Sequence, residues 1–314
     1  MKHLVLVLLL SVVLFGCTSN SGGNQGPSDG NFRTGTQGLE IYFPVGLPDQ
    51  IYENDFDVKI PVGVQNKGAF PQFDELGDFE AYLWIGGYDS NIININPDNG
   101  IRLDERDLEG KSQFLEGGGI ALEEFTADVR DLPSGAPFYK PNILFTVTYF
   151  YKTVASPVVC IDPEPRSSTV RDKVCSVQDS ISVSSQGAPI AVTRVEQDVG
   201  SQTMRFRIYI RNAGNGIVIP QEDVDLNPNI GYDWRELNEI RIDDIQVGDT
   251  RMSSCRPDIG DRVELINGEG VISCTFDSSL ADNRVFTTPL NIELSYGYST
   301  SQSRVFEVFE AIDI

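Results

Sequence analysis

The chain of 314 residues is strongly acidic, with 46 aspartates and glutamates against 24 lysines and arginines and a formal net charge of −22. A field of this sign repels nucleic acids and anionic lipid surfaces, so neither is expected as a partner. Hydrophobic residues make up 40% of the chain, which excludes a fully disordered protein and allows real hydrophobic cores. The length leaves room for two domains.

The first sixteen residues have the pattern of an export signal. A short cationic start, residues 1–3, precedes an apolar run from Leu4 to Phe15 that only Ser11 interrupts. A membrane-spanning helix needs about 20 apolar residues, so this run is too short to cross a bilayer and is typical of a signal peptide. We therefore expect residues 1–16 to be removed.

The leader ends in Leu14-Phe15-Gly16-Cys17, which resembles the lipobox of prokaryotic lipoproteins. The resemblance implies that Cys17 becomes a lipid-bearing N-terminus, and two acyl chains anchor a protein far more firmly than one. The alternative is an ordinary signal peptide with a chance cysteine. Residues 17–38 then hold the lipidated cysteine and a flexible tether rich in glycine and serine. The expected location is the exported face of a cell membrane, at the cell surface or in the periplasm.

Four cysteines remain after Cys17, and an even number in an exported chain suggests disulfides. Four cysteines allow three connectivities, of which nearest-neighbour pairing, Cys160 with Cys175 and Cys255 with Cys274, is the simplest. A zinc site is the rival interpretation, but the sequence lacks both closely spaced CxxC pairs and histidines to support it.

The second half of the chain repeats the first. The segments "DFDVKIPVGVQNKG" and "TMRFRIYIRNAG" both alternate apolar and polar residues and both end in Asn-x-Gly, so that Asn66 matches Asn212 at an offset of 146. Some eighty residues further on, Tyr149 matches Tyr296 and Tyr151 matches Tyr298 at an offset of 147. The nearly constant offset indicates a duplication.

The residue pattern of both copies predicts antiparallel β-strands. Phe56, Val58, Ile60, Val62 and Val64 share one face of the first segment, as do Met204, Phe206, Ile208 and Ile210 in the second, which is the period of two that a half-buried strand requires. Frequent turn signals and the lack of a long helical pattern predict an all-β fold of two tandem sandwiches. The expected organisation is a first sandwich over 39–161, a disulfide-stapled connector over 162–187 and a second sandwich over 188–314.

The strand rich in valine and isoleucine that ends in Asn-x-Gly, preceded by "PDQIYENDF", resembles the B-strand region of immunoglobulin-like modules of the CARDB type. Such modules occur in archaeal and bacterial surface proteins. The resemblance implies a seven-stranded immunoglobulin-like sandwich in each copy and a role in adhesion or display. It supplies no catalytic residues.

Little in the sequence points to catalysis. The only histidine, His3, lies in the leader, so a mature Ser-His-Asp or Cys-His machinery is excluded, and no phosphate-binding or nucleophile-elbow motif occurs. A pair of carboxylates for glycoside hydrolysis remains a third hypothesis, but 46 acidic residues allow any pair to be nominated. We expect a protein that is not an enzyme and has no cofactor.

Calcium is the one ion that the sequence leaves open. Asp104-Glu105-Arg106-Asp107, and Asp223 and Asp225 with Asn227 and Asn229, place oxygen ligands in turn-like segments of the kind that Ca²⁺ prefers. Neither has the spacing of an EF-hand, and the alternative is that these are solvated acidic loops.

Two features are candidates for a binding face. In "DFEAYLWIGGYD", Tyr82 and Trp84 alternate with the apolar face and are expected on the outside, unless the neighbouring domain covers them or the register is reversed. Arg205, Arg207 and Arg211 line the outer side of the strand that buries Phe206. They are available to an acidic glycan or protein, or they pair across strands with acids such as Glu293.

These observations predict a non-enzymatic, lipid-anchored surface protein that adheres to or recognises an envelope component, a glycan or a neighbouring cell. The alternative is a structural spacer or accessory subunit of an envelope complex. Expected partners are the membrane, through the lipid anchor, and an extracellular protein or glycan.

Overall fold

The computed structural model describes residues 32–47, 50–164, 173–200, 203–252, 254–277 and 284–311. The expected leader, Cys17 and most of the tether lie outside these residues. Within the described ranges no helix is long and apolar enough to cross a membrane.

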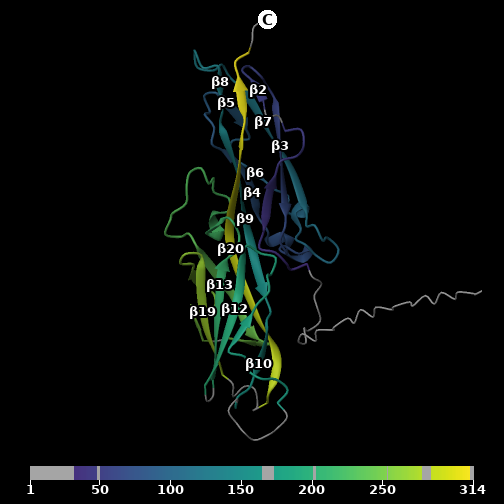
Figure 1. Ribbon diagram of the computed structural model, residues 1–314, viewed down its shortest axis with the longest axis vertical. Coiled ribbons are helices and arrows are strands. Elements are labelled where there is room, and N and C mark those ends of the chain that lie inside the picture. The colour runs from purple at the N-terminus through teal and green to yellow at the C-terminus, as the bar shows by residue number, and fades with distance from the viewer. Residues whose placement is uncertain are drawn as a thin grey trace, which may run out of the picture.

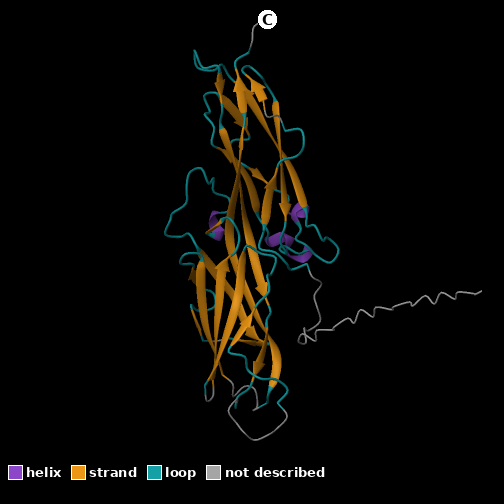
Figure 2. Cartoon of the chain, in the orientation of Figure 1, coloured by secondary structure: helices purple, strands orange, loops and turns teal. Residues whose placement is uncertain are grey.

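The chain is nearly all β, as Figure 2 shows, which confirms the predicted fold class. The first sheet has the spatial order β1 (Leu39–Tyr42), β3 (Val58–Asn66), β7 (Ile120–Val129), β5 (Ile93–Asn96). The five-stranded sheet has the order β11 (Ser180–Ser182), β12 (Ile190–Val199), β13 (Thr203–Asn212), β19 (Glu269–Asp277), β17 (Cys255–Arg256).

A nine-stranded sheet packs against both. It runs in the order β16 (Thr250–Arg251), β15 (Glu239–Val247), β20 (Phe286–Val305), β9 (Asn142–Ala155), β4 (Ala81–Gly86), β6 (Ile101–Arg102), with β10 (Val158–Ile161) and β14 (Ile217–Ile219) on β20 and β18 (Arg262–Glu264) on β15. A small sheet joins β2 (Gln50–Tyr52), β21 (Glu307–Phe309) and β8 (Phe138–Tyr139). The short 3-10 helices are η1 (Phe73–Asp78), η2 (Glu105–Leu108) and η3 (Gln221–Asp223).

The alternation seen in the sequence determines which side chains form the core. On β13, Met204, Phe206, Ile208 and Ile210 are at most 1% exposed, and their neighbours in the chain face outward. On β3, Ile60, Val62 and Val64 are buried in the same way. Phe56 differs from the expectation: it precedes the first residue of β3 and is 72% exposed, because the chain turns before the strand begins.

The two halves of the chain share one sheet. The longest strands of the two copies, β9 in the first and β20 in the second, pair antiparallel along the whole of β9, with Tyr149 opposite Tyr298 and Tyr151 opposite Tyr296. Since the repeat matches Tyr149 to Tyr296 and Tyr151 to Tyr298, the pairing is symmetric about the pair of Phe150 and Gly297. The four tyrosines are buried at this centre, and β9 and β20 run side by side through the waist of the elongated molecule (Figure 1).

A second connection lies at one end of the molecule. Strand β21, from the end of the chain, lies between β2 and β8, parallel to the first and antiparallel to the second. The last strand of the second half therefore completes a sheet of the first half. The sequence pattern predicts two tandem units but contains no signal for either of these connections.

Both cysteine pairs expected from the sequence are joined. Cys160 and Cys175 form one disulfide, with their Cα atoms 5.9 Å apart. Cys255 and Cys274 form the other, with a Cα–Cα distance of 4.0 Å, because they face each other directly on β17 and β19.

Candidate binding groove

Trp84 does not lie on an exposed surface, and the expectation for this residue is wrong. Its side chain is 5% exposed, and its Nε1 donates a hydrogen bond of 2.8 Å to Thr148 Oγ1. Thr148 Oγ1 in turn donates to the carbonyl oxygen of Val224, at 2.6 Å. The outer side of β4 is therefore covered by the loop after η3, a segment of the second half of the chain, which is the alternative that the sequence left open.

Tyr82 is only half-buried and stacks on Trp84, with the ring centroids 5.8 Å apart. Its hydroxyl donates to Glu80 Oε1 at 2.7 Å. Burial and the neighbouring Glu80 carboxylate raise the pKa of Tyr82 to about 12. Tyr82 and Trp84 belong to the nine-stranded sheet and the three arginines to the five-stranded sheet, so these two features do not form a single face.

Arg205, Arg207 and Arg211 point outward from β13, as the alternation predicts. Arg207 pairs with Glu196 of β12, Nη2 to Oε2 at 3.2 Å, rather than with Glu293. Glu293 lies on β20, in the other sheet of the sandwich. Among the described residues no ion pair involves Arg205 or Arg211.

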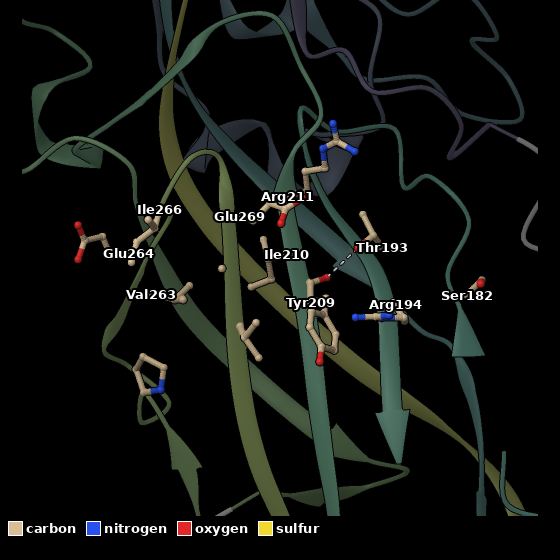
Figure 3. A pocket seen from close by; sticks show the side chains of 13 residues that line it. Ser182, Thr193, Arg194, Tyr209, Ile210, Arg211, Val263, Glu264, Ile266 and Glu269 are labelled. Carbon is tan, nitrogen blue, oxygen red and sulfur yellow. Dashed lines mark hydrogen bonds between the residues drawn. The ribbon is translucent and has the colours of Figure 1, made fainter. Parts of the chain in front are cut away.

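Arg211 opens onto a groove of about 730 Å³ on this face (Figure 3). Its walls come from β11, β12, β13, β18 and β19 and the adjoining turns. The lining residues are Ser182, Thr193, Arg194, Tyr209, Ile210, Arg211, Pro257, Val263, Glu264, Ile266, Glu269, Gly270 and Val271. The groove thus mixes charged, hydroxyl and apolar side chains on a rigid sheet.

Arg194 and Tyr209, which line the groove, belong to an ordered polar cluster. The guanidinium of Arg194 lies over the ring of Tyr209, 4.0 Å from its centroid, a favourable cation–π geometry. The Tyr209 hydroxyl donates to Glu196 Oε2 at 2.9 Å, and Arg194 also contacts Glu196, Nη2 to Oε1 at 3.3 Å. Glu196 therefore holds Arg194, Arg207 and Tyr209 in place. In the part of the chain that the structure describes, no carboxylate forms an ion pair with Arg211, although Glu269 faces it from β19.

The exposed apolar side chains of the groove are Ile266 and Val271, which are 67% and 43% exposed. Arg194 and Arg211 supply positive charge, Glu264 and Glu269 supply negative charge, and Glu269 lies directly opposite Arg211 on the neighbouring strand β19. This face carries Arg194, Arg205, Arg207 and Arg211, interleaved with Glu196, Asp198 and Glu269, in a chain with nearly twice as many acids as bases. An acidic ligand is the one that this face attracts.

The acidic segments considered for calcium serve local structure. Asp104 caps η2 by accepting from the Arg106 amide, and Asn227 Oδ1 accepts from the Asn229 amide at 2.9 Å. In the part of the chain that the structure describes, no three His, Cys, Asp or Glu side chains gather in a way that could hold a metal.

Carboxylates also gather on the nine-stranded sheet. Burial raises the pKa of Glu293, and the charges of Asp244 and Asp243 raise it further. Burial likewise raises the pKa of Asp243, against hydrogen bonding from Ser295 and the charge of Arg241. A nearby hollow of about 300 Å³ is lined by the ion pairs of Arg262 with Glu222 and Glu239. The paired charges favour a structural role for this hollow.

Sequence reasoning missed four residues of interest. Tyr209 follows the same outward alternation as the three arginines, and Arg194 with Glu196 lies on the neighbouring strand, so the strand pattern contained a signal for both. Trp234 is 75% exposed and lies in an acidic loop rich in turns. An isolated tryptophan among charged residues was the signal for it.

No protein-family model matches the chain, and no curated protein matches it in sequence. Among solved structures, the chain is similar to "BspA_C_WT", at 9% identity and a TM-score of 0.18 over 88% of this chain and 98% of the other. It is also similar to "Streptococcus agalactiae AgI/II polypeptide BspA C terminal domain (WT)", at 8% identity and a TM-score of 0.17 over 87% and 97%. Such low scores carry no functional conclusion, so we infer function from this chain's own residues.

Proposed function

We propose that this protein is a non-enzymatic, lipid-anchored surface protein that recognises an acidic partner through the groove beside β13. The observation that carries the proposal is Arg211, an exposed arginine at an open groove, without an ion pair among the described residues. Arg194 also lines the groove, and Glu196 contacts both Arg194 and Arg207 on the same face of the sheet.

The test is binding of the chain without its leader to two acidic probes, polygalacturonate and polyglutamate. We expect saturable binding that weakens as salt rises, because exposed charge pairs are screened. Arg211→Glu should abolish it, whereas Arg106→Glu, an exposed arginine on η2 in the other half, should not. Loss in both variants to the same degree would point to net charge alone and would count against the groove.

The lipid anchor is a separate part of the proposal and rests on the lipobox resemblance around Cys17. Two disulfides support an exported location, since disulfides persist in oxidising compartments. Mass spectrometry of the membrane fraction should find a diacylglycerol-modified Cys17 at the N-terminus. Cys17→Ser should release the protein from the membrane, and an unmodified N-terminus at Cys17 would overturn this part.

A structural spacer is the second candidate, and the shared sheet favours it. Fourteen consecutive residues of β9 pair with β20, so the two halves are joined by a continuous hydrogen-bonded ladder. A spacer would leave both acidic probes unbound and remain in one complex through detergent extraction. Binding in the polyanion test therefore separates the two candidates.

A further inference from the structure

A long loop of the second half displays apolar side chains to solvent. Residues 213–238 link β13 to β15 and include β14 and η3, whereas the corresponding link in the first half, 67–80, is little more than half as long. The added length carries Leu226, Ile230 and Trp234, which are 47%, 85% and 75% exposed. Exposed apolar side chains that gather on one loop mark interaction sites, and tryptophan is enriched among the residues that dominate binding energy.

The loop is held in a defined shape. Val224 is 1% exposed, and its carbonyl accepts the hydrogen bond from Thr148 Oγ1. Asn229 Nδ2 donates to the carbonyl oxygen of Ile85 at 3.1 Å. Backbone hydrogen bonds close turns at Ile230 and Glu236. The exposed side chains are therefore displayed by an ordered loop, which lowers the entropy cost of binding.

The charges around these apolar side chains define the partner. Asp225, Asp233 and Glu236 are exposed on the loop, and Arg235 is its one basic residue. These acids disfavour contact with anionic lipid surfaces. The complementary surface combines apolar side chains with arginines. The groove beside β13 has this combination: Ile266 and Val271 line it together with Arg194 and Arg211, and Glu264 and Glu269 are its acidic residues.

We infer that the loop of one copy, with its exposed Trp234, docks into the groove of a second copy. This inference rests on the proposed function, because it names the acidic partner of the same groove. Loop and groove are different surfaces of one chain, so the contact is head to tail. One copy uses its loop and keeps a free groove, and the other uses its groove and keeps a free loop. Anchored copies on one membrane meet at a high effective concentration, which lets a weak contact form.

Sedimentation velocity on residues 17–314 carrying Cys17→Ser tests the inference, up to about 1 mM, a concentration of the order that tethering provides. We expect oligomers that grow with protein concentration and shrink with salt. Trp234→Ala should weaken self-association at least about 30-fold, as for a hot-spot tryptophan, and Arg211→Glu should do the same. Arg106→Glu should associate like the wild type.

Mixing the two deficient variants gives the decisive result. Trp234→Ala retains the groove and Arg211→Glu retains the loop, so together they should form a one-to-one dimer and nothing larger. If the mixture stays monomeric, or if both variants associate as the wild type does, the inference is overturned. A wild type that stays monomeric but binds polygalacturonate or polyglutamate would overturn it while the proposed function survives. If neither a second copy nor a polyanion binds, both fail.

Discussion

The hydroxyl of Tyr298 donates a hydrogen bond to Asn212 Oδ1 at 2.9 Å, and in the first half the hydroxyl of Tyr151 donates to Asn66 Oδ1 at 3.3 Å. Each asparagine ends the strand after which the chain turns at Asn-x-Gly, and each tyrosine lies on the central pair of strands. The two bonds join residues that the repeat places in equivalent positions. They connect each outer sheet to the shared sheet.

Removing one of these hydroxyls should destabilise the protein. Tyr298 Oη also accepts from the Gly216 amide at 2.9 Å, so Tyr298→Phe leaves a half-buried donor and a half-buried acceptor without their partner. We expect a loss of about 1–3 kcal/mol in the free energy of unfolding, measured by urea denaturation. Tyr151→Phe should behave alike, and the exposed Tyr42→Phe is the control. An unchanged midpoint for both buried variants would show that the bonds do not stabilise the fold.

The periodicity of a strand shows which of its side chains face the core, and this limits what the sequence can predict. The alternation of apolar and polar residues around Phe206 predicts which side of β13 faces the core of the second half, and the structure confirms this prediction. The same pattern does not say what covers the other side of a strand. It therefore predicts an exposed Trp84, whereas in the structure a loop from the other half of the chain buries this residue. The pairing of β9 with β20 depends on contacts between distant segments, and no local pattern encodes it.

Cys160 and Cys175 close a loop with a sequence separation of 15. The chain-entropy account assigns about 3 kcal/mol to a bridge across a loop of that length. We expect the double variant with serine at both positions to lose stability by about this amount in urea denaturation. Serine at the exposed Val174, inside the same segment, should change little. A double variant as stable as the wild type would show that the bridge leaves the unfolded chain unconstrained.

Glu293 makes the stability depend on pH in a predictable direction. Burial raises the pKa of Glu293 in the folded protein, so between the ordinary carboxyl pKa and the raised value the folded state binds more protons than the unfolded state. This contribution therefore falls as pH rises through that window. Glu293→Gln should therefore increase the free energy of unfolding at neutral pH and raise the melting temperature. The gain should be less than about 1 kcal/mol because the side chain is partly solvated. The gain should vanish below pH 4, as thermal melts across pH can measure.

A matched control for that series is Glu116→Gln, an exposed glutamate in the loop before β7. Its difference from the wild type should stay near zero at every pH. A gain for Glu293→Gln that persists undiminished in acid would mean that packing, and not the carboxylate charge, is responsible.

The two tryptophans should report on different environments. Trp84→Phe leaves Trp234, which is 75% exposed, and Trp234→Phe leaves Trp84, which is 5% exposed. Acrylamide should therefore quench the fluorescence of the first variant strongly and that of the second weakly. Trp84→Phe should also lose about 0.5–1.5 kcal/mol of stability with its hydrogen bond to Thr148. Equal quenching of both variants would contradict the arrangement of the loop over β4.

Glu196 is the acid that competes with an acidic ligand for the arginines of the groove. It contacts Arg194, Arg207 and the Tyr209 hydroxyl, so Glu196→Gln removes a negative charge and frees two guanidinium groups. We expect polyglutamate to bind about fivefold more tightly, equivalent to about 1 kcal/mol, the upper range for a surface ion pair. The gain should shrink in high salt, and Glu116→Gln should show none. Weaker binding by Glu196→Gln would mean instead that the carboxylate positions Arg194 and Arg207 for the ligand.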